Sequence, residues 1–386
     1  MKQLSLFATI GAAICLSACG GHKETVELTK SGLNPENFNS VYNGEPTALY
    51  TLNNSQGAEA CITNFGGRLV SLMVPDKNGN LQDVVLGMDS VQAYYPENNL
   101  TDFGASIGRY ANRINQGRFV IDGDTIQLPQ NNFGHSLHGG GEMGDRGWQY
   151  RVFTANQLND STLVLSLISP DGDNNYPGEV TAQVIYTLQN DNALDIQYKA
   201  ITDKPTIINM TNHSYFNLGG NPSQPVTDNL LMVNASGYTP VDSTYMTTGE
   251  IATVEGTPFD FRNARCVGDN IKDFDNQQIK NGNGYDHNFV LDTNGDILVP
   301  AAELYSPESG IVMTMYTTEP GVQIYSGNFL DGTITGKKGV VYNQHAGICL
   351  ESQHYPDSPN KADWPSTRLN PGETYNTRTV YKFSTK

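Results

Sequence analysis

Two ionisable side chains, His213 and Glu351, have the chemistry of a general acid and a general base. His213 lies in residues 209–218, NMTNHSYFNL, directly after the β-branched run at 206–208, so we expect it at the end of a strand. An imidazole among small polar and aromatic neighbours is suited to oriented hydrogen bonds and can transfer a proton near neutral pH. A lone strand histidine is more often structural, so a catalytic role requires a partner.

Glu351 is the carboxylate that we predict as this partner. It closes the otherwise apolar strand in residues 347–357, GICLESQHYPD, and a period of two puts it on one face with Gly347 and Cys349. Burying a carboxylate among such small residues is costly unless it is paired or functional, and burial raises its proton affinity, as a general base at neutral pH requires. The alternative is a strand-end glutamate in contact with water.

Two arginines, Arg109 and Arg113, flank Asn112 in residues 108–114, GRYANRI. The planar guanidinium offers a fork of donors, and the amide offers both a donor and an acceptor. Together they suit a neutral ligand with many hydroxyl groups. The alternative is that one or both arginines form surface salt bridges.

A glycine-rich stretch with two histidines follows at residues 135–141, HSLHGGG. Because no HExxH pattern or third ligand accompanies His135 and His138, we expect no metal site there. No Lys-Ser/Thr pair follows the glycines, so the stretch is not a phosphate loop. A histidine that hydrogen-bonds a ligand is favoured, and a loop-capping histidine is the alternative.

Two further polar side chains stand in apolar strands. Asp286, in residues 284–289, GYDHNF, can accept two hydroxyl hydrogen bonds, although an aspartate after Gly-Tyr also closes turns. Gln323 alternates with apolar neighbours in residues 319–328, and its face belongs either to the core or to a site.

Residues 171–179, DGDNNYPGE, place oxygen side chains at alternate positions, like the start of a calcium loop. The twelve-residue frame of such loops is absent. A solvated turn is therefore favoured, and a weak calcium site stays as an alternative hypothesis.

The elements that must position these side chains are short strands. Apolar runs are separated by Gly, Asn, Asp and Pro, helical periodicity is not sustained, and Asp122-Gly123 between two such runs is a strong hairpin signal. This pattern is typical of a β-sandwich or barrel. Strands are expected at residues 58–65, 69–74, 119–121, 125–128, 162–168, 180–188, 193–201, 230–234, 311–317, 322–326, 347–351 and 379–383, and helical turns at 91–95 and 269–274.

Residues 1–18 are predicted to be a signal peptide. Lys2 precedes an apolar core at 4–16 that is too short for a permanent membrane span. The end of this segment, Leu16-Ser17-Ala18-Cys19, resembles a bacterial lipobox, in which cleavage precedes the cysteine and lipid is attached to it. An ordinary secretory peptide is the alternative. We expect a lipid at Cys19, a polar tether over residues 19–40, and a place in the bacterial cell envelope, facing the periplasm or the cell surface.

Composition narrows the partners of the mature chain. With 40 acidic and 23 basic side chains, the net charge of −17 disfavours nucleic acid, and also membrane contact other than through the anchor. Without an internal repeat or linker, residues 41–386 are expected to form one domain, which we predict to be monomeric. After Cys19 only Cys61, Cys266 and Cys349 remain, which allows one disulfide at most and shows no zinc spacing.

Taken together, the motifs resemble the aldose 1-epimerase (galactose mutarotase) family, in a lipoprotein-type bacterial form. The resemblance implies an all-β fold, a large antiparallel β-sandwich with few short helices. The Asp-Asn-Asn stretch at 173–175 departs from the family pattern, which points to an altered loop or a bound ion there. The matching motifs are GRYANRI at 108, HSLHGG at 135, NHSYFNL at 212, YDHNFV at 285, TTEPGVQIYSGNFLDG at 317 and GICLESQHYPDSPN at 347.

The resemblance also implies roles for the matching residues. His213 would be the general acid and Glu351 the general base, while Arg109 is the motif residue least expected to touch a ligand. Interconverting sugar anomers needs a base at the C1 hydroxyl and an acid at the ring oxygen, and no metal, nucleotide or covalent nucleophile. We expect Glu351 ionised and His213 protonated at the start. Contacts with the sugar are implied for Asn112, Arg113, His138, Ser214, Tyr215, Asp286 and Gln323.

Three other functions remain open on the sequence. A hexose-6-phosphate 1-epimerase would share the acid–base pair and would need a cationic phosphate pocket. A glycosidase would need two carboxylates beside the scissile bond, such as Glu351 and Asp286. A non-catalytic sugar-binding lipoprotein would bind sugar without transferring a proton.

Overall fold

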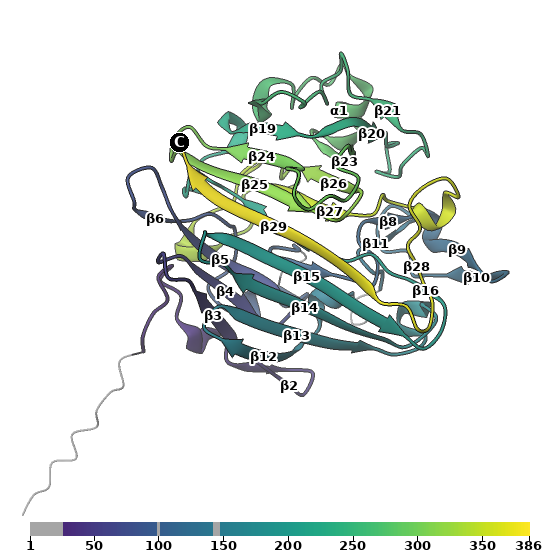
Figure 1. Ribbon diagram of the computed structural model, residues 1–386, viewed down its shortest axis with the longest axis horizontal. Coiled ribbons are helices and arrows are strands. Elements are labelled where there is room, and N and C mark those ends of the chain that lie inside the picture. Colours follow the sequence, from purple (N-terminus) through teal and green to yellow (C-terminus); the bar gives the residue numbers. More distant parts are fainter. Residues whose placement is uncertain (1–25, 99–100, 142–146) are drawn as a thin grey trace, which may run out of the picture.

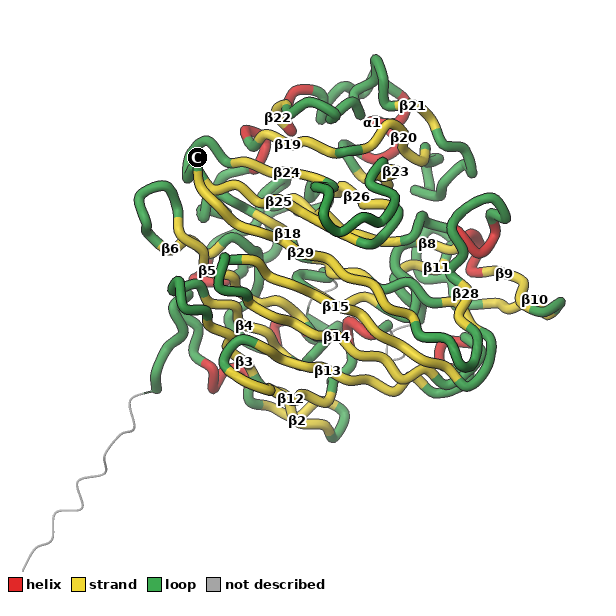
Figure 2. The backbone as a smooth tube through the Cα atoms, in the orientation of Figure 1, coloured by secondary structure: helices red, strands yellow, loops and turns green. Residues whose placement is uncertain are grey.

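Two large antiparallel sheets with a shared core form the body of the protein (Figure 1). The structure, a computed structural model, describes residues 26–98, 101–141 and 147–386. The predicted signal peptide and Cys19 lie outside the described residues. Strands dominate the described chain and helices are few and short (Figure 2), which confirms the predicted all-β antiparallel sandwich.

The larger sheet has nine strands. Its strand β14 alternates fully buried with more exposed side chains, because successive side chains of a strand point to opposite faces. The hydrogen-bonded order of the sheet is β12 (Thr154–Asn159), β13 (Thr162–Ser169), β14 (Val180–Leu188), β15 (Ala193–Thr202), β29 (Tyr375–Thr385), β25 (Ile311–Thr317), β24 (Ala302–Tyr305), β19 (Leu230–Val233) and β22 (Arg265–Cys266).

The second sheet has six strands and carries several of the predicted site residues. Every side chain of its central strands β26 and β27 is buried, because one face packs on the core and the other faces the cavity described below. The order is β18 (Tyr215–Phe216), β27 (Ile348–Gln353), β26 (Gly321–Tyr325), β23 (Asp286–Leu291), β20 (Ala235–Thr239) and β21 (Ala252–Thr253).

Smaller elements complete the described chain. A four-stranded sheet has the order β3 (Leu49–Asn53), β4 (Glu59–Thr63), β5 (Arg68–Pro75) and β6 (Leu81–Asp83). Five pairs follow: β1 (Ser40–Tyr42) with β2 (Glu45–Thr47), β7 (Ala105–Ile107) with β17 (Thr211–His213), β8 (Arg113–Ile114) with β11 (Ser136–Leu137), β9 (Arg118–Ile121) with β10 (Asp124–Gln127), and β16 (Thr206–Ile207) with β28 (Arg368–Leu369).

The core lies between the two large sheets and ties their strands together. Tyr381 of β29 packs its ring 5.0 Å from that of Phe216 in β18, and its hydroxyl donates a hydrogen bond of 2.7 Å to the Leu350 carbonyl in β27. Ile348 and Leu350 point into this core. Cys349 and Glu351 therefore point the other way, on the face where the sequence placed them together.

Helices play little part in this fold. A 3₁₀ turn at Gln92–Tyr94 lies within the helical turn expected at 91–95. The turn expected at 269–274 is wrong, because a 3₁₀ turn ends at Asp269 and the α-helix α1 (Gln277–Gly282) begins only after Asn276, whose side chain caps it. None of the helices in the described ranges is long and apolar enough to cross a bilayer.

The segment predicted as a tether packs on the domain well before residue 41. Lys30 donates its backbone N–H to Glu59 over 2.7 Å, and the Ser31 hydroxyl donates to that of Ser71 over 3.0 Å. Leu33 and Phe38 are buried. These apolar side chains lie in a mostly polar stretch, so composition alone placed the boundary too late.

Candidate active site

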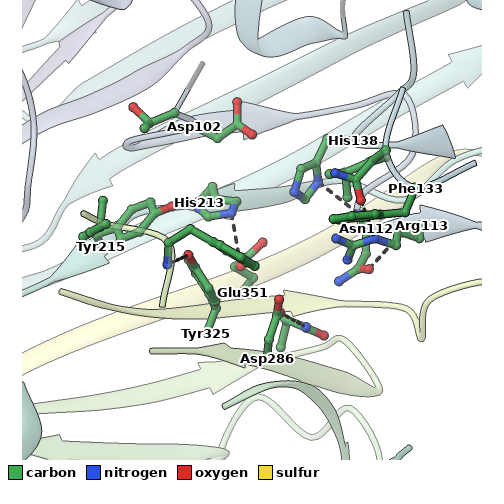
Figure 3. A pocket seen from close by; sticks show the side chains of 16 residues that line it. Asp102, Asn112, Arg113, Phe133, His138, His213, Tyr215, Asp286, Tyr325 and Glu351 are labelled. Atoms are coloured by element: carbon green, nitrogen blue, oxygen red, sulfur yellow. Dashed lines mark hydrogen bonds and ion pairs between the residues drawn. The ribbon is translucent and has the colours of Figure 1, made fainter. Parts of the chain in front are cut away.

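A cavity of about 350 Å³ opens between the six-stranded sheet and the loops before β7 and β11 (Figure 3). Among the described residues that line it, Arg113 is the only arginine or lysine, and it faces several carboxylates. The cavity therefore suits a neutral polar ligand better than an anion. Its lining is Thr101, Asp102, Asn112, Arg113, Asn132, Phe133, Leu137, His138, His213, Tyr215, Asp286, Gln323, Tyr325, Phe329, Leu330 and Glu351.

His213 and Glu351 meet at this cavity although their strands belong to different sheets. The distance from His213 Nε2 to Glu351 Oε1 is 3.5 Å, and both side chains are buried. The pairing of Tyr215 with Cys349, between β18 and β27, brings the two segments together. No described protein group hydrogen-bonds Glu351 Oε2, which is a buried acceptor without a partner.

The surroundings of Glu351 favour its protonated form. Burial raises the pKa of this carboxyl well above its ordinary value, and the charges of Asp286 and Asp102 act in the same direction. Arg113 opposes them with a smaller effect. This is the direction that the sequence predicted, and it makes Glu351 a strong proton acceptor once it is ionised.

His213 is not held charged, contrary to the expectation from sequence. Burial, to which the charge of Arg68 adds, lowers its pKa to about 4. The neighbouring carboxyl does not offset this effect, because Glu351 itself favours the neutral form. The free site therefore holds a neutral imidazole beside a carboxyl whose pKa is raised.

Cys349 sets the orientation of the His213 ring. Its sulfur lies 3.6 Å from His213 Nδ1, and burial raises the pKa of the thiol well above its ordinary value. The thiol therefore stays protonated, and Nε2 is the ring nitrogen that faces Glu351.

His138 presents a hydrogen-bond donor to the cavity. Its Nδ1 accepts the backbone N–H of Asn112 over 3.1 Å, and its own backbone N–H donates to the Asn112 carbonyl over 3.0 Å. Burial lowers the pKa of His138 well below its ordinary value, so the ring is neutral with its proton on Nε2. Its ring lies 5.3 Å from that of His213.

The two arginines of the GRYANRI motif have different environments. Arg113 lines the cavity, where its Nε donates to Asn132 over 3.1 Å and its guanidinium lies 5.1 Å from the Tyr245 ring centre. Arg109 is buried outside the lining, where it donates to the Pro177 and Gly178 carbonyls over 2.9 Å each. Arg113 is thus placed for a ligand, and Arg109 is placed to hold a loop.

Asp286 and Gln323 lie side by side on β23 and β26. Gln323 Nε2 donates to Asp286 Oδ1 over 2.6 Å, and no described protein group bonds Gln323 Oε1. The face of Gln323 that the sequence left open is therefore the cavity side. Burial raises the pKa of Asp286, while Arg113 and Gln323 act to lower it.

Ser214 does not reach the cavity, unlike Tyr215. Its hydroxyl donates to the Asn212 side chain over 2.5 Å and is buried. This position does not favour the expected sugar contact, because the alternation of β17 and β18 turns Ser214 away from the face that carries His213. Tyr215 lines the cavity, with its ring 5.1 Å from that of His213.

The cavity also contains residues for which the sequence offered no signal. Asp102 and Glu351 lie on opposite sides of His213 in the view of Figure 3. Asp102 precedes β7 in a loop without a recognisable motif. Phe133 and Phe329 expose 61% and 54% of their surface, so the cavity has an aromatic rim where apolar side chains would be expected to turn inward.

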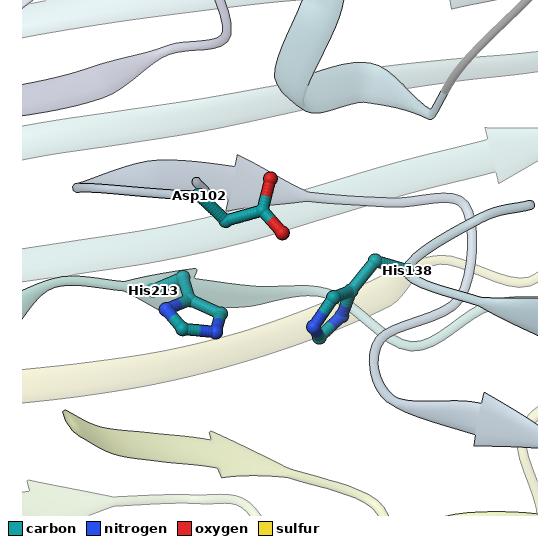
Figure 4. Close-up of side chains that lie close together, drawn as sticks. All are labelled: Asp102, His138 and His213. Atoms are coloured by element: carbon teal, nitrogen blue, oxygen red, sulfur yellow. The ribbon is translucent and has the colours of Figure 1, made fainter. Parts of the chain in front are cut away.

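Asp102, His138 and His213 offer ligand atoms within 4.8 Å of one another (Figure 4). A metal-bound histidine normally donates its other ring N–H to an acceptor. Here the second nitrogen of His138 instead accepts the Asn112 N–H, so the cavity-facing nitrogen carries a proton. The three side chains therefore fit hydrogen bonding to a neutral ligand better than metal coordination.

The loop with the calcium-like spacing is closed by ion pairs. Asp171 pairs with Lys204 and also accepts the Gly178 N–H over 2.6 Å. Asp173 pairs with Arg151 and accepts a hydrogen bond from Ser169. Because these cationic partners occupy both carboxylates, the geometry does not support a calcium site here.

Known proteins share this sequence pattern over most of its length. The family described as Aldose 1-epimerase matches residues 48–382. The chain is 42% identical to the galactose mutarotase of Homo sapiens over 323 residues, which cover 84% of this chain and 90% of that protein. It is 40% identical to the aldose 1-epimerase of Escherichia coli K12 over 344 residues, 88% of this chain and 96% of that protein.

Solved structures show the same fold. An aldose epimerase homologue from C. elegans superposes with a TM-score of 0.80 at 31% identity, covering 88% of this chain and 99% of that one. A galactose 1-epimerase from Lactobacillus acidophilus has a TM-score of 0.78 at 30% identity and covers 90% and 97%.

Proposed function

The chain belongs to the aldose 1-epimerase family, and from this premise we propose the substrates of this isomerase and the roles of its cavity residues. It interconverts the α and β anomers of free aldohexoses of the glucose and galactose type. Glu351 acts as the base and His213 as the acid. The observation that carries this assignment is the 3.5 Å contact of the two side chains inside a cavity with many hydrogen-bonding groups.

The reaction needs two proton transfers on one hemiacetal. Glu351 removes the proton of the C1 hydroxyl while His213 protonates the ring oxygen, and the ring opens to an aldehyde. Rotation about C1–C2 exposes the other face of the aldehyde. Closure then uses His213 as base and Glu351 as acid, so both groups return to their starting forms.

The pair already carries the one proton that this cycle requires, but the proton is on Glu351 and not on His213. A protonated Glu351 beside a neutral His213 carries the same number of protons as a carboxylate beside an imidazolium. We propose that a bound sugar favours the charged arrangement, because its C1 hydroxyl donates a hydrogen bond to the Glu351 carboxylate, and a hydrogen bond to the charged form favours that form.

The remaining groups hold the sugar in place. His138 donates from Nε2 toward the ring oxygen, and Arg113 with Asn112 binds hydroxyl groups beside it. Asp286 and Gln323 bind hydroxyl groups on the opposite wall, where a hydrogen bond of 2.6 Å joins the two side chains. These side chains fix the face of the sugar that meets the acid–base pair.

The rate should depend on pH as a bell-shaped curve. The active pair carries one proton. Below pH about 4, His213 gains a second proton while Glu351 stays protonated, so no base remains. As pH rises through the elevated pKa of Glu351, the pair loses its proton and no acid remains.

Polarimetric kcat/KM across this pH range checks the bell-shaped curve after subtraction of spontaneous mutarotation. A rate that keeps rising with pH would contradict the assignment.

Arg113→Lys is expected to raise KM by about tenfold, since losing one charged hydrogen bond costs about 1.5 kcal/mol. A lysine cannot keep both the Asn132 contact and a fork directed at hydroxyl groups. Initial rates over a range of sugar concentrations measure the effect. Arg109→Lys is the matched control, expected to lower the melting temperature without changing KM, and an equal KM change in both variants would refute the prediction.

Polarimetry with freshly dissolved α-glucose and α-galactose tests the proposed substrates directly. We expect the purified protein to accelerate the approach to the anomeric equilibrium of both sugars. Sugar binding without acceleration would instead identify a non-catalytic binding protein. Cleavage of an aryl glycoside would identify a glycosidase.

A phosphorylated substrate fits this cavity less well. Arg113 is the only arginine or lysine in its described lining, and the carboxyl groups of Asp102, Asp286 and Glu351 share the space. A phosphate dianion would be repelled rather than held. Hexose 6-phosphates should therefore be poorer substrates than the free hexoses in the same assay.

We further propose that the protein works as a lipid-anchored monomer in the cell envelope. The support is the lipobox-like sequence that ends in Cys19 and the apolar segment before it. Metabolic labelling with a fatty acid, compared with a Cys19→Ser variant, tests the anchor. Light scattering of the chain without residues 1–18 tests the monomer.

A further inference from the structure

A largely buried ion pair lies outside the cavity, at the ends of the strands that form the cavity. Glu319 occupies the turn between β25 and β26, and His354 directly follows β27. Glu319 Oε2 lies 2.6 Å from His354 Nδ1, and the two side chains are 1% and 18% exposed. Burial acts to lower the pKa of His354, but the Glu319 charge and hydrogen bond outweigh it and raise the pKa. The contact with Glu319 therefore favours the protonated form of His354.

This ion pair is part of a closed ring of hydrogen bonds. The Tyr375 hydroxyl donates to Glu319 Oε1 over 3.1 Å and accepts the Met210 N–H over 3.1 Å. On the other side, the His354 N–H donates to Asn209 Oδ1 over 3.0 Å. Because Asn209 and Met210 are adjacent in the chain, the ring closes through their peptide bond.

The ring holds backbone segments that carry the acid and the base. Met210 leads into β17 and His213, and His354 continues β27 beyond Glu351. Asn209 also bonds the neighbouring GRYANRI segment, since its carbonyl accepts the Ala111 N–H over 2.8 Å. None of the ring residues belongs to the described lining of the cavity. The ring can influence the reaction only through the positions of these segments.

The sheets alone hold His213 and Glu351 together weakly. In the described sheets, β17 pairs with β7. The segment around His213 reaches β27 by a backbone ladder of only two residues, those of β18. The β18 residues of that ladder follow His213 in the sequence, and the ring residues Asn209 and Met210 precede His213. The two together fix the backbone of His213 from both sides, which matters because a 1 Å displacement of reacting groups costs about 10²-fold in rate.

We propose that Glu319 and His354 are positioning residues for the epimerase reaction, whose hydrogen bonds close a ring that sets the distance between His213 and Glu351. This inference rests on the proposed roles of His213 and Glu351 as acid and base. The ring acts by geometry, so its effect belongs in kcat and not in the binding of the sugar.

Glu319→Ala opens the ring and is expected to lower kcat by about 10²-fold while KM stays within a few-fold of wild type. Glu319→Gln provides the conservative comparison. Its amide oxygen can accept from Tyr375 and its amide N–H can donate to a neutral His354, so the ring survives and kcat should stay within a few-fold of wild type. Both constants come from initial polarimetric rates of the folded enzyme.

The control is a second, largely buried ion pair, in which Lys337 Nζ lies 2.6 Å from Asp83 Oδ2 outside the cavity. Asp83→Ala should lower the melting temperature and leave kcat unchanged. Tyr375→Phe removes one hydroxyl group of the ring, so it should lower kcat less than Glu319→Ala does, again without a KM change. It serves as the test if Glu319→Ala fails to fold.

Three results would overturn the inference: a wild-type kcat in the folded variant that opens the ring, an equal loss of kcat in Glu319→Gln and Glu319→Ala, or an equal loss in Asp83→Ala. An inactive wild-type protein would instead overturn the proposed function, before any variant is compared. The two failures are therefore distinguishable.

Discussion

Glu351→Gln is expected to lower kcat/KM for mutarotation by about 10²–10⁴-fold, the usual contribution of a positioned general base. The amide keeps the shape of the side chain but cannot accept the C1 proton. Sugar binding should persist, because the hydroxyl-binding side chains are unchanged. Polarimetry on α-glucose and α-galactose measures the rate, and calorimetric titration measures the binding.

The stability of this variant provides a second readout. Glu351 is a buried carboxyl whose Oε2 has no described partner, so the site bears a cost that the amide removes in part. We expect a melting temperature equal to or above that of the wild type. Unchanged activity in Glu351→Gln would refute the mechanism, and lost activity with an unfolded chain would be uninformative about the base.

His213→Asn is expected to reduce kcat/KM by a similar factor, about 10²–10⁴. The asparagine amide can replace the ring nitrogen that contacts Cys349, at 3.6 Å, but it places no proton donor where Nε2 faces Glu351. The ring oxygen then departs without a proton. The measurement is again polarimetric, with circular dichroism to confirm the β-rich fold.

The double variant separates a shared mechanism from two independent defects. Acid and base act on the same hemiacetal, so Glu351→Gln with His213→Asn should be little slower than the more damaged single variant. A multiplicative loss would indicate that the two side chains serve separate steps. Retention of activity in His213→Asn would assign the acid to another donor, for which His138 Nε2 is placed.

His213 and Glu351 are in contact in their neutral forms before the sugar binds. Burial shifts the pKa of Glu351 upward and that of His213 downward, so neither group is charged in the way the reaction requires before the sugar binds. The sugar itself completes the site by donating hydrogen bonds to the carboxylate, which favour its charged form. Specificity and catalysis are therefore linked through the same hydroxyl contacts.

Several features of the fold were predictable from the sequence because they depend on local pattern. The strands at 180–188 and 311–317 have the predicted bounds, since side-chain alternation is a property of each strand. The shared face of Cys349 and Glu351 follows from the same period of two. The turns around residue 270 were misplaced, because the capping side chain of Asn276 decides where the helix begins.

The surroundings of His213 were not predictable in this way. Its neighbourhood is divided among β16, β17 and β18, which pair with β28, β7 and β27. Each partner lies far away in the chain, so no local pattern shows that Asp102 enters the cavity. Glu319 and His354 are also far apart in the chain, so no local pattern predicts the ring that they close.

The sequence by itself determined the residue types at the site and the sandwich that carries them, because composition, motifs and strand periodicity are properties of the chain. Only the tertiary structure decided which atoms meet and which protonation states they hold. The physical reason is desolvation: the pKa shifts of His213 and Glu351 depend on how completely distant segments exclude water from both groups.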